Sequence, residues 1–197
     1  MKERKLGEFS LLVFDEVYEP AEDSFLLAEN LSVKPGDIVL DVGSGTGIIS
    51  ISAMVKGARH VVAIDISPLA AKNTLINAEK NKGKGKVDVI VGDLLTPLKS
   101  VLLFDLITFN PPYLPVEDAG GLGLAWSGGK TGREVVERFI SMVKRLSRSP
   151  KTKCQIVLSS LMQPRKLLEQ LSSLGFKYVI NAKKRFFFEE ICLITFY

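Results

Sequence analysis

Cysteine and histidine are scarce in this chain, which contains two cysteines and one histidine among 197 residues. Cys154 and Cys192 each lie in an apolar run, without a CxxC pair or a nearby histidine. We therefore expect buried, reduced thiols and no metal site. Long apolar runs are also missing. The longest uncharged stretch, Val42 to Val55, is too short and too rich in glycine and serine to span a bilayer.

The charged N-terminus is not followed by the apolar segment of a secretory signal, which predicts a cytoplasmic protein. Apolar residues make up 46% of the chain and charged residues 24%, a balance typical of a globular protein rather than a disordered one. The length predicts one domain over residues 1–197, which we divide into an N-terminal extension (1–16), an N-terminal helix motif (17–36) and a core (37–197).

The net charge of +4 and the pI near 9.0 point towards nucleic acid as a partner. The basic residues are scattered, however, and the densest cluster, Lys80 to Lys86, has the pattern of a solvated loop after a helix. Charge alone therefore gives weak support for nucleic-acid binding.

From residue 37 onwards, short β-branched runs alternate with helical segments, as in a doubly wound α/β fold with a mostly parallel sheet. We predict parallel strands at 38–42, 60–65, 87–91, 105–109 and 155–159, and a closing antiparallel hairpin from 176–182 and 190–196. Helices are predicted at 47–57, 68–81, 132–147 and 164–174. A further helix begins near Pro20 and is expected to pack over the carboxyl edge of the sheet. This layout predicts a Rossmann-like fold.

A glycine-rich loop, Asp41-Val42-Gly43-Ser44-Gly45-Thr46-Gly47, follows the first predicted strand and opens a helix. Glycines allow a tight turn there and let a ligand approach the backbone. Their alternate spacing differs from a dinucleotide fingerprint, which would place its last glycine where Ile48 stands. The loop therefore predicts a nucleoside ligand other than a dinucleotide.

Acidic residues stand at or near the ends of the first three predicted strands, at Asp41, Asp65 and Asp93. Asp65 is placed to accept hydrogen bonds from a ribose diol, and Asp93 with the following Leu94 is placed to hold an adenine. Three acids repel phosphate and attract a cation. One such acid alone could simply cap a helix, but the three in order predict binding of S-adenosylmethionine.

The fourth predicted strand ends in Asn110-Pro111-Pro112-Tyr113. The two prolines lack backbone donors, so the carbonyls of Asn110 and Pro111 are expected as fixed acceptors, and the Asn110 side chain adds another. Two convergent acceptors match the two hydrogens of a planar NH2 group, which predicts methyl transfer to an amide or to a base amine. Tyr113 is expected either to stack on that group or to pack on the core. The single histidine, His60, begins the second strand at the opposite edge and is read as structural.

Asn-Pro-Pro-Tyr in this position resembles the signature of amino methyltransferases, including adenine and guanine methylases and the HemK-type glutamine methyltransferases. Two stretches are similar to the short, single-domain HemK relatives of archaea and eukaryotes: Val17 to Leu27, and Trp126 to Arg133. The resemblance extends from Val17 to the closing hairpin. It implies a class I methyltransferase fold with seven strands in the order 3-2-1-4-5-7-6. It also implies S-adenosylmethionine as methyl donor, S-adenosylhomocysteine as product, and no metal.

Carried over by position, the resemblance implies that Asp41 and Gly43 lie near the methionine part of the donor and that Asn110 holds the substrate amide with the Pro111 carbonyl. The family usually has Thr where Ser24 stands and often Glu where Asp41 stands, and both changes keep the polar group. The implied cofactor-binding residues are Ser24, Asp41, Gly43, Gly45, Gly47, Asp65, Ile66, Asp93, Leu94 and Asn110. The implied catalytic residues are Asn110, Pro111, Pro112 and Tyr113.

The resemblance further implies that the substrate is the glutamine of the Gly-Gly-Gln motif in a class I release factor, and that a small zinc-binding activator subunit forms a heterodimer with this chain. A nucleic-acid methylase is the main alternative, but it would need a recognition domain or a broad basic cleft for which the chain has no room. A lysine methylase would need a base, and none is evident. A non-catalytic cofactor-binding subunit would not need the Asn110 motif.

Overall fold

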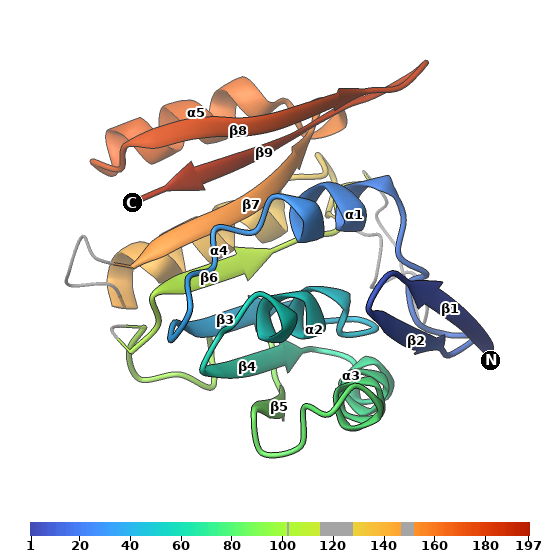
Figure 1. Cartoon of the computed structure of the whole chain (residues 1–197). Coiled ribbons are helices and arrows are strands. Elements are labelled where there is room, and N and C mark those ends of the chain that lie inside the picture. Colours follow the sequence, from blue (N-terminus) through green and yellow to red (C-terminus); the bar gives the residue numbers. More distant parts are fainter. Residues whose placement is uncertain (102, 115–127, 147–151) are drawn as a thin grey trace.

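The computed structural model describes the chain except for residues 102, 115–127 and 147–151. A seven-stranded sheet forms its centre, in the order β5-β4-β3-β6-β7-β9-β8 (Figure 1). The strands are β3 (Ile38–Val42), β4 (His60–Asp65), β5 (Val87–Val91), β6 (Leu106–Phe109), β7 (Lys153–Ser159), β8 (Tyr178–Arg185) and β9 (Glu190–Phe196). The first five are parallel, whereas β9 is antiparallel to both β7 and β8. Counted from β3, this confirms the predicted order and the closing hairpin.

Helices cover both faces of the sheet. The helices α1 (Glu22–Glu29), α2 (Ile48–Val55) and α3 (Pro68–Lys80) share one hydrophobic cluster, and α4 (Glu134–Leu146) and α5 (Pro164–Ser173) share the other. A short 3-10 helix (Ser160–Met162) links β7 to α5. No helix in the described ranges is long and apolar enough to cross a membrane.

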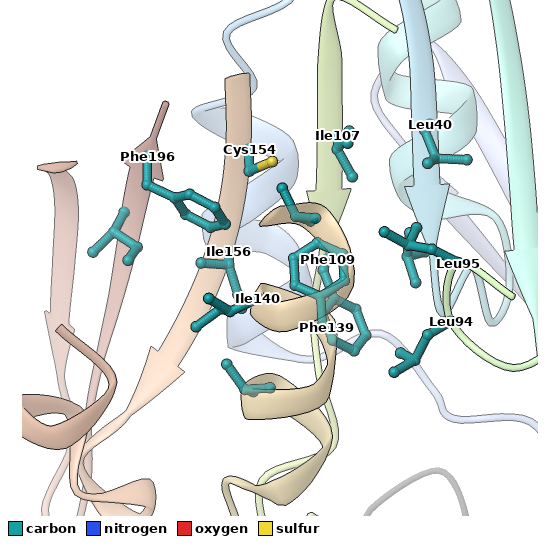
Figure 2. Packing of buried hydrophobic residues seen from close by; sticks show 14 of the residues in the cluster. Leu40, Leu94, Leu95, Ile107, Phe109, Phe139, Ile140, Cys154, Ile156 and Phe196 are labelled. Atoms are coloured by element: carbon teal, nitrogen blue, oxygen red, sulfur yellow. The ribbon is translucent and has the colours of Figure 1, made fainter. Parts of the chain in front are cut away.

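The hydrophobic cluster beneath α4 combines apolar residues of the sheet with the apolar face of this helix. Val136, Phe139, Ile140 and Val143 are the buried residues of α4, a spacing that forms one helical face. Phe139 packs against Phe109 of β6 with ring centroids 4.8 Å apart (Figure 2). This contact fixes α4 over the end of β6, beside Asn110.

Residues 1–16 were expected only as an extension, but they contain an antiparallel hairpin of β1 (Lys2–Leu6) and β2 (Phe9–Val13). Leu11 of β2 is completely buried in the cluster that contains α1 and α2. The hairpin lies next to α3 in Figure 1. Because both strands are short and β1 is mostly charged, hydrophobic periodicity did not predict this hairpin.

Two other elements differ from prediction. The strand β8 continues to Arg185 through a basic run that we expected in the connection, because Lys183, Lys184 and Arg185 pair with β9. At an edge strand such charged side chains can remain in solvent. The helix α1 begins at the carboxyl edge of the sheet, but Leu26 and Leu27 lie on the sheet face with α2. Only its first turn contributes to that edge.

Candidate active site

A pocket of about 250 Å³ opens at the carboxyl ends of β3, β4, β5 and β6. Its walls come from the glycine-rich loop, the segment Glu16 to Pro20 ahead of α1, and the first turns of α4 through Val135 and Arg138. Parallel α/β sheets bind ligands at this edge, where the connections diverge to opposite faces. The pocket therefore occupies the position expected for a nucleoside.

The glycine-rich loop owes its shape to three left-handed residues. Gly43, Gly45 and Gly47 have φ values of 67°, 56° and 81°. The backbone N–H of Gly43 donates to the Ile64 carbonyl at 2.8 Å, which ties the loop to the end of β4. Among the described residues, no atom beyond the two chain neighbours lies within 4 Å of the place that a Cβ would take at Gly45, so its backbone is open to close approach.

Asp65 at the end of β4 is held by backbone donors. Its two oxygens accept the N–H groups of Gly45 at 2.8 Å and Ser67 at 2.9 Å. Burial raises the pKa of the Asp65 carboxyl, and these hydrogen bonds oppose the rise. The carboxylate is therefore rigidly placed beside the pocket, with lone pairs remaining for a diol.

Asp93 lies across the pocket and is bound by a residue that the sequence did not suggest. The guanidinium of Arg138 on α4 lies 2.5 Å from one carboxylate oxygen of Asp93. The neighbouring Leu94 is buried and has a φ of 50°. Arg138 and Asp93 together link α4 to the loop after β5.

Asp41 is buried beneath the glycine-rich loop, with 1% of its surface exposed, and does not line the pocket. The hydroxyl of Ser50 donates to it at 2.6 Å and that of Thr108 at 3.2 Å. Burial raises the pKa of this carboxyl to about 7, against the opposing effect of the two hydroxyls. The resemblance implied a position near the methionine part of the donor, and the structure places the Asp41 side chain under the backbone of the glycine-rich loop.

Asn110 follows β6 and lines the pocket. Its side-chain amide donates to Ser24 Oγ at 3.3 Å. Its side-chain carbonyl oxygen is buried and accepts no hydrogen bond from the described residues. A buried acceptor without a donor is costly in a folded protein, and at a pocket wall it indicates a ligand that supplies the donor.

A buried acid at the start of α1 organises the neighbours of Asn110. Asp23 accepts hydrogen bonds from the hydroxyls of Tyr18 at 3.0 Å, Ser24 at 3.2 Å and Tyr113 at 3.4 Å. Burial, and then the Asp23 charge, raise the pKa of both tyrosines, so their hydroxyls remain protonated donors. Tyr18 and Asp23 belong to the motif Val17 to Leu27, and the resemblance assigns neither of them a role at the site. An acid among the apolar residues of α1 was the available signal.

Three asparagines spaced four apart, two on α3 and one at its C-cap, bind the backbone of β2 and of Phe14 after it through their side-chain amides. The side chains of Asn73, Asn77 and Asn81 accept the N–H groups of Phe14, Leu12 and Ser10 at 3.0, 2.7 and 3.1 Å. They also donate to the Leu12 and Ser10 carbonyls. Asn77 additionally donates to the Thr46 carbonyl in the glycine-rich loop at 2.9 Å. We refer to these three residues as the asparagine ladder, which sequence analysis missed.

Comparisons with known proteins show the family to which this chain belongs. The chain is 39% identical to a protein of Methanocaldococcus jannaschii named as an N5-glutamine methyltransferase, over 94% of this chain and 93% of that protein. It is 36% identical to the methyltransferase HEMK2 of Homo sapiens, over 82% of this chain and 80% of HEMK2. The chain belongs to this protein N5-glutamine methyltransferase family. It is therefore an S-adenosylmethionine-dependent enzyme.

Two further matches extend the comparison. The profile of the ribosomal protein L11 methyltransferase (PrmA) family matches residues 22–110. The structure of the E. cuniculi Mtq2–Trm112 complex, described as responsible for methylation of the termination factor eRF1, is 26% identical. The match covers 92% of this chain and 98% of the matched chain in that structure, with a TM-score of 0.67.

The structure of this methyltransferase brings together most of the residues singled out from its sequence. The residues of that set that line the pocket are Ser24, Gly43, Gly45, Asp65, Ile66, Asp93, Leu94, Asn110 and Pro112. Asp41, Gly47, Pro111 and Tyr113 are not among the residues that line this pocket. Gly47 begins α2, with Thr74 of α3 against it.

The glycine motif before α4 forms a compact turn in the part that the structure describes. The Glu134 carboxylate accepts the N–H groups of Thr131 and Arg133, and the Gly128 N–H donates to the Leu114 carbonyl at 2.9 Å. Trp126 and Ser127 of the same motif lie outside the described residues. The turn joins the end of the Asn110 motif to the start of α4.

His60 and the cysteines lie away from the pocket. His60 on β4 contacts Asp88 of β5 at 2.9 Å, near the amino ends of the strands. Within the described ranges, no group of three histidine, cysteine or acidic side chains could hold a metal ion.

Proposed function

We propose that this methyltransferase modifies the side-chain amide nitrogen of the glutamine in the Gly-Gly-Gln motif of a class I release factor. The observation that carries the proposal is the buried Asn110 carbonyl oxygen, which has no donor among the described residues. A primary amide offers such a donor and is planar, so it fits between this oxygen and a second fixed acceptor. The relatives and the Mtq2–Trm112 likeness support the choice of a glutamine in a termination factor.

The pocket residues fit S-adenosylmethionine. In the proposed arrangement Asp65 accepts the ribose hydroxyls, while Ile66 and Leu94 contact the adenine face. Asp93 accepts from the adenine amino group with the oxygen that Arg138 leaves available. Ser24 and the glycines at 43 and 45 border the methionine part, and Gly47 and the buried Asp41 support the loop from behind. The bound donor supplies a methyl group on a sulfonium centre.

Asn110 and Pro111 hold the nucleophile. In the described part of the chain no hydrogen bond reaches the backbone carbonyl of either residue. We assign one amide hydrogen of the substrate to Asn110 Oδ1 and the other to the Pro111 carbonyl. Accepting these hydrogens raises electron density on the nitrogen and stabilises the positive charge that develops as the methyl group arrives. Pro112 keeps the turn rigid. The hydroxyls of Tyr113 and Ser24 both donate to Asp23, which ties the turn to the start of α1.

Proton loss needs no dedicated base, because an amide nitrogen that has accepted a methyl group is strongly acidic and gives its proton to water. Asp23, the buried acid nearest to Asn110 in the hydrogen-bond network, is occupied by three hydroxyl donors. This arrangement suits an amide, which attacks without prior deprotonation. A lysine ammonium would first have to lose a proton.

We further propose that a small zinc-binding subunit related to Trm112 forms a heterodimer with this chain, as suggested by the Mtq2–Trm112 complex. The heterodimer would act in the cytoplasm, where release factors work. In this proposal residues 1–197 form one methyltransferase domain, and nucleic acid is not the acceptor.

The test is the mass of a Gly-Gly-Gln peptide and of an intact release factor after incubation with S-adenosylmethionine, with and without a Trm112-type partner. A pool of structured RNA serves as a competing acceptor. We expect one added methyl group on the glutamine. In Asn110→Ala the rate should fall at least about a hundredfold, since the residue both orients the nucleophile and stabilises its charge.

Asn181→Ala is a matched control, because Asn181 lies on β8 and contacts only Thr195 among the hydrogen bonds described. It should keep normal activity, and Asn110→Ala should keep nearly normal cofactor affinity by calorimetry. Methylation of RNA alone would refute the assigned substrate. Loss of cofactor binding together with activity in Asn110→Ala would refute its assigned role.

A further inference from the structure

The connection between β8 and β9 carries two phenylalanines that are almost fully exposed. Phe187 is 93% exposed and Phe188 is 88% exposed, and their ring centroids lie 4.7 Å apart. The preceding Phe186 packs against the core cluster that contains α1. Two adjacent large apolar side chains in solvent oppose solubility, which indicates a surface that another molecule covers.

This connection lies at the edge of the sheet where the pocket opens. The strand β9 is antiparallel to β7, so Ile191 at its beginning lies opposite Ser159 at the carboxyl end of β7. In Figure 1 the hairpin tip projects on the side to which the arrowheads of β4, β6 and β7 point. The two rings therefore share an edge with the site of methyl transfer.

The tip is anchored to the segments that hold the site. The Ser159 hydroxyl donates to the Glu189 carboxylate at 2.6 Å, and the Glu190 N–H donates to Ser160 Oγ at 3.1 Å. Lys184 forms an ion pair with Glu22 at the start of α1, which also contains Ser24. The backbone beneath the rings is thus fixed, and little conformational entropy remains to be lost on binding there.

Charge at the tip favours a protein partner over a nucleic acid. Lys184 is paired with Glu22, and Lys183 lies 3.2 Å from Glu190. Glu189 adds a further negative charge next to the rings. A surface that binds single-stranded nucleic acid would combine its aromatic residues with several cations directed at phosphates. Here both lysines already have acidic partners, and Arg185 is the one cation of this run without an ion pair among the described residues.

We propose that Phe187 and Phe188 form a docking element for the folded protein substrate, inserting into an apolar recess of the release-factor domain that presents the glutamine. This inference rests on the proposed function. Asn110 and Pro111 hold the glutamine amide, while the two rings bind the surrounding domain. A short peptide has no such domain, so only the intact factor gains affinity from the rings.

The test compares KM values for the intact release factor and for a Gly-Gly-Gln peptide, using the complete enzyme with its partner. In the double variant Phe187→Ser/Phe188→Ser, KM for the intact factor should rise about tenfold or more, as for loss of aromatic anchors at an interface. Its kcat, its KM for the peptide and its thermal unfolding temperature should stay within error. Phe187→Leu/Phe188→Leu should restore most of the affinity.

Leu103→Ser is the matched control. Leu103 is 75% exposed but precedes β6, at the opposite edge of the sheet. It should leave both KM values unchanged. An unchanged KM for the intact factor in the double serine variant would overturn the assignment, as would an equal rise for the peptide. If the wild-type enzyme methylates neither substrate, the proposed function itself is wrong and the docking role falls with it.

Discussion

The asparagine ladder on α3 allows a quantitative prediction from its hydrogen bonds. Asn77 is completely buried, accepts from the Leu12 N–H at 2.7 Å and donates to the Leu12 and Thr46 carbonyls. In Asn77→Ala the Leu12 N–H and the Thr46 carbonyl lose this partner, while the Leu12 carbonyl keeps Asn73. Each buried backbone group left without a partner costs about 1–3 kcal/mol, so the free energy of unfolding should fall by about 3 kcal/mol.

The assay is urea denaturation at fixed pH, with the m-value checked so that only stability changes are compared. Asn30→Ala provides the control, because Asn30 is exposed and its side chain makes one hydrogen bond among the described residues, to the Leu26 carbonyl. Its loss should cost about 0.5 kcal/mol. A cost below about 1 kcal/mol for Asn77→Ala, or one equal to that of the control, would refute the reasoning.

Because Thr46 belongs to the loop that lines the pocket, Asn77→Ala should also weaken binding of S-adenosylmethionine. Calorimetry would detect this change, and Asn30→Ala should keep normal affinity. A destabilised variant with unchanged cofactor affinity would show that the ladder holds only the hairpin.

Two further predictions concern Asp41 and Gly47, the first and last residues of the glycine-rich loop. Burial raises the pKa of Asp41 to about 7 in the folded chain, above its ordinary value of 3.8, so the folded state binds a proton more tightly than the unfolded state. The resulting stability is complete below about pH 4 and is lost as the pH rises to about 7. The stability difference between the wild type and Asp41→Asn, measured by urea denaturation, should therefore decline over that range, and a flat difference would contradict the stated cause. Gly47→Ala should lower stability by about 2 kcal/mol, because φ is 81° and the added Cβ would lie 3.0 Å from Thr74. In the control Gly36→Ala, φ is also positive at 93°, but no atom of the described residues beyond the chain neighbours lies within 4 Å of the added Cβ, so the cost should be about 1 kcal/mol. Equal costs would show that the contact with Thr74 is unimportant.

Local sequence determined the framework of this methyltransferase. The parallel strands are continuous apolar runs because both of their faces are covered, and the helices between them carry apolar residues on one face. The glycine-rich loop was recognisable because its conformation requires residues without a Cβ. The Asn110 motif was recognisable because prolines and an amide have few other reasons to follow a strand together.

The tertiary structure decided how these parts support one another. The asparagine ladder joins residues 59 to 71 positions apart, and the Asn110 to Ser24 contact joins residues 86 positions apart. The sequence does not announce such pairs, because one side chain has many potential partners and only the packed chain selects among them. The same reason explains the buried place of Asp41, the pairing of Arg138 with Asp93, and the lack of a donor for the Asn110 carbonyl among the described residues. The residue types were therefore readable from the sequence, whereas which polar atoms were satisfied and which were left for a ligand depended on the folded chain.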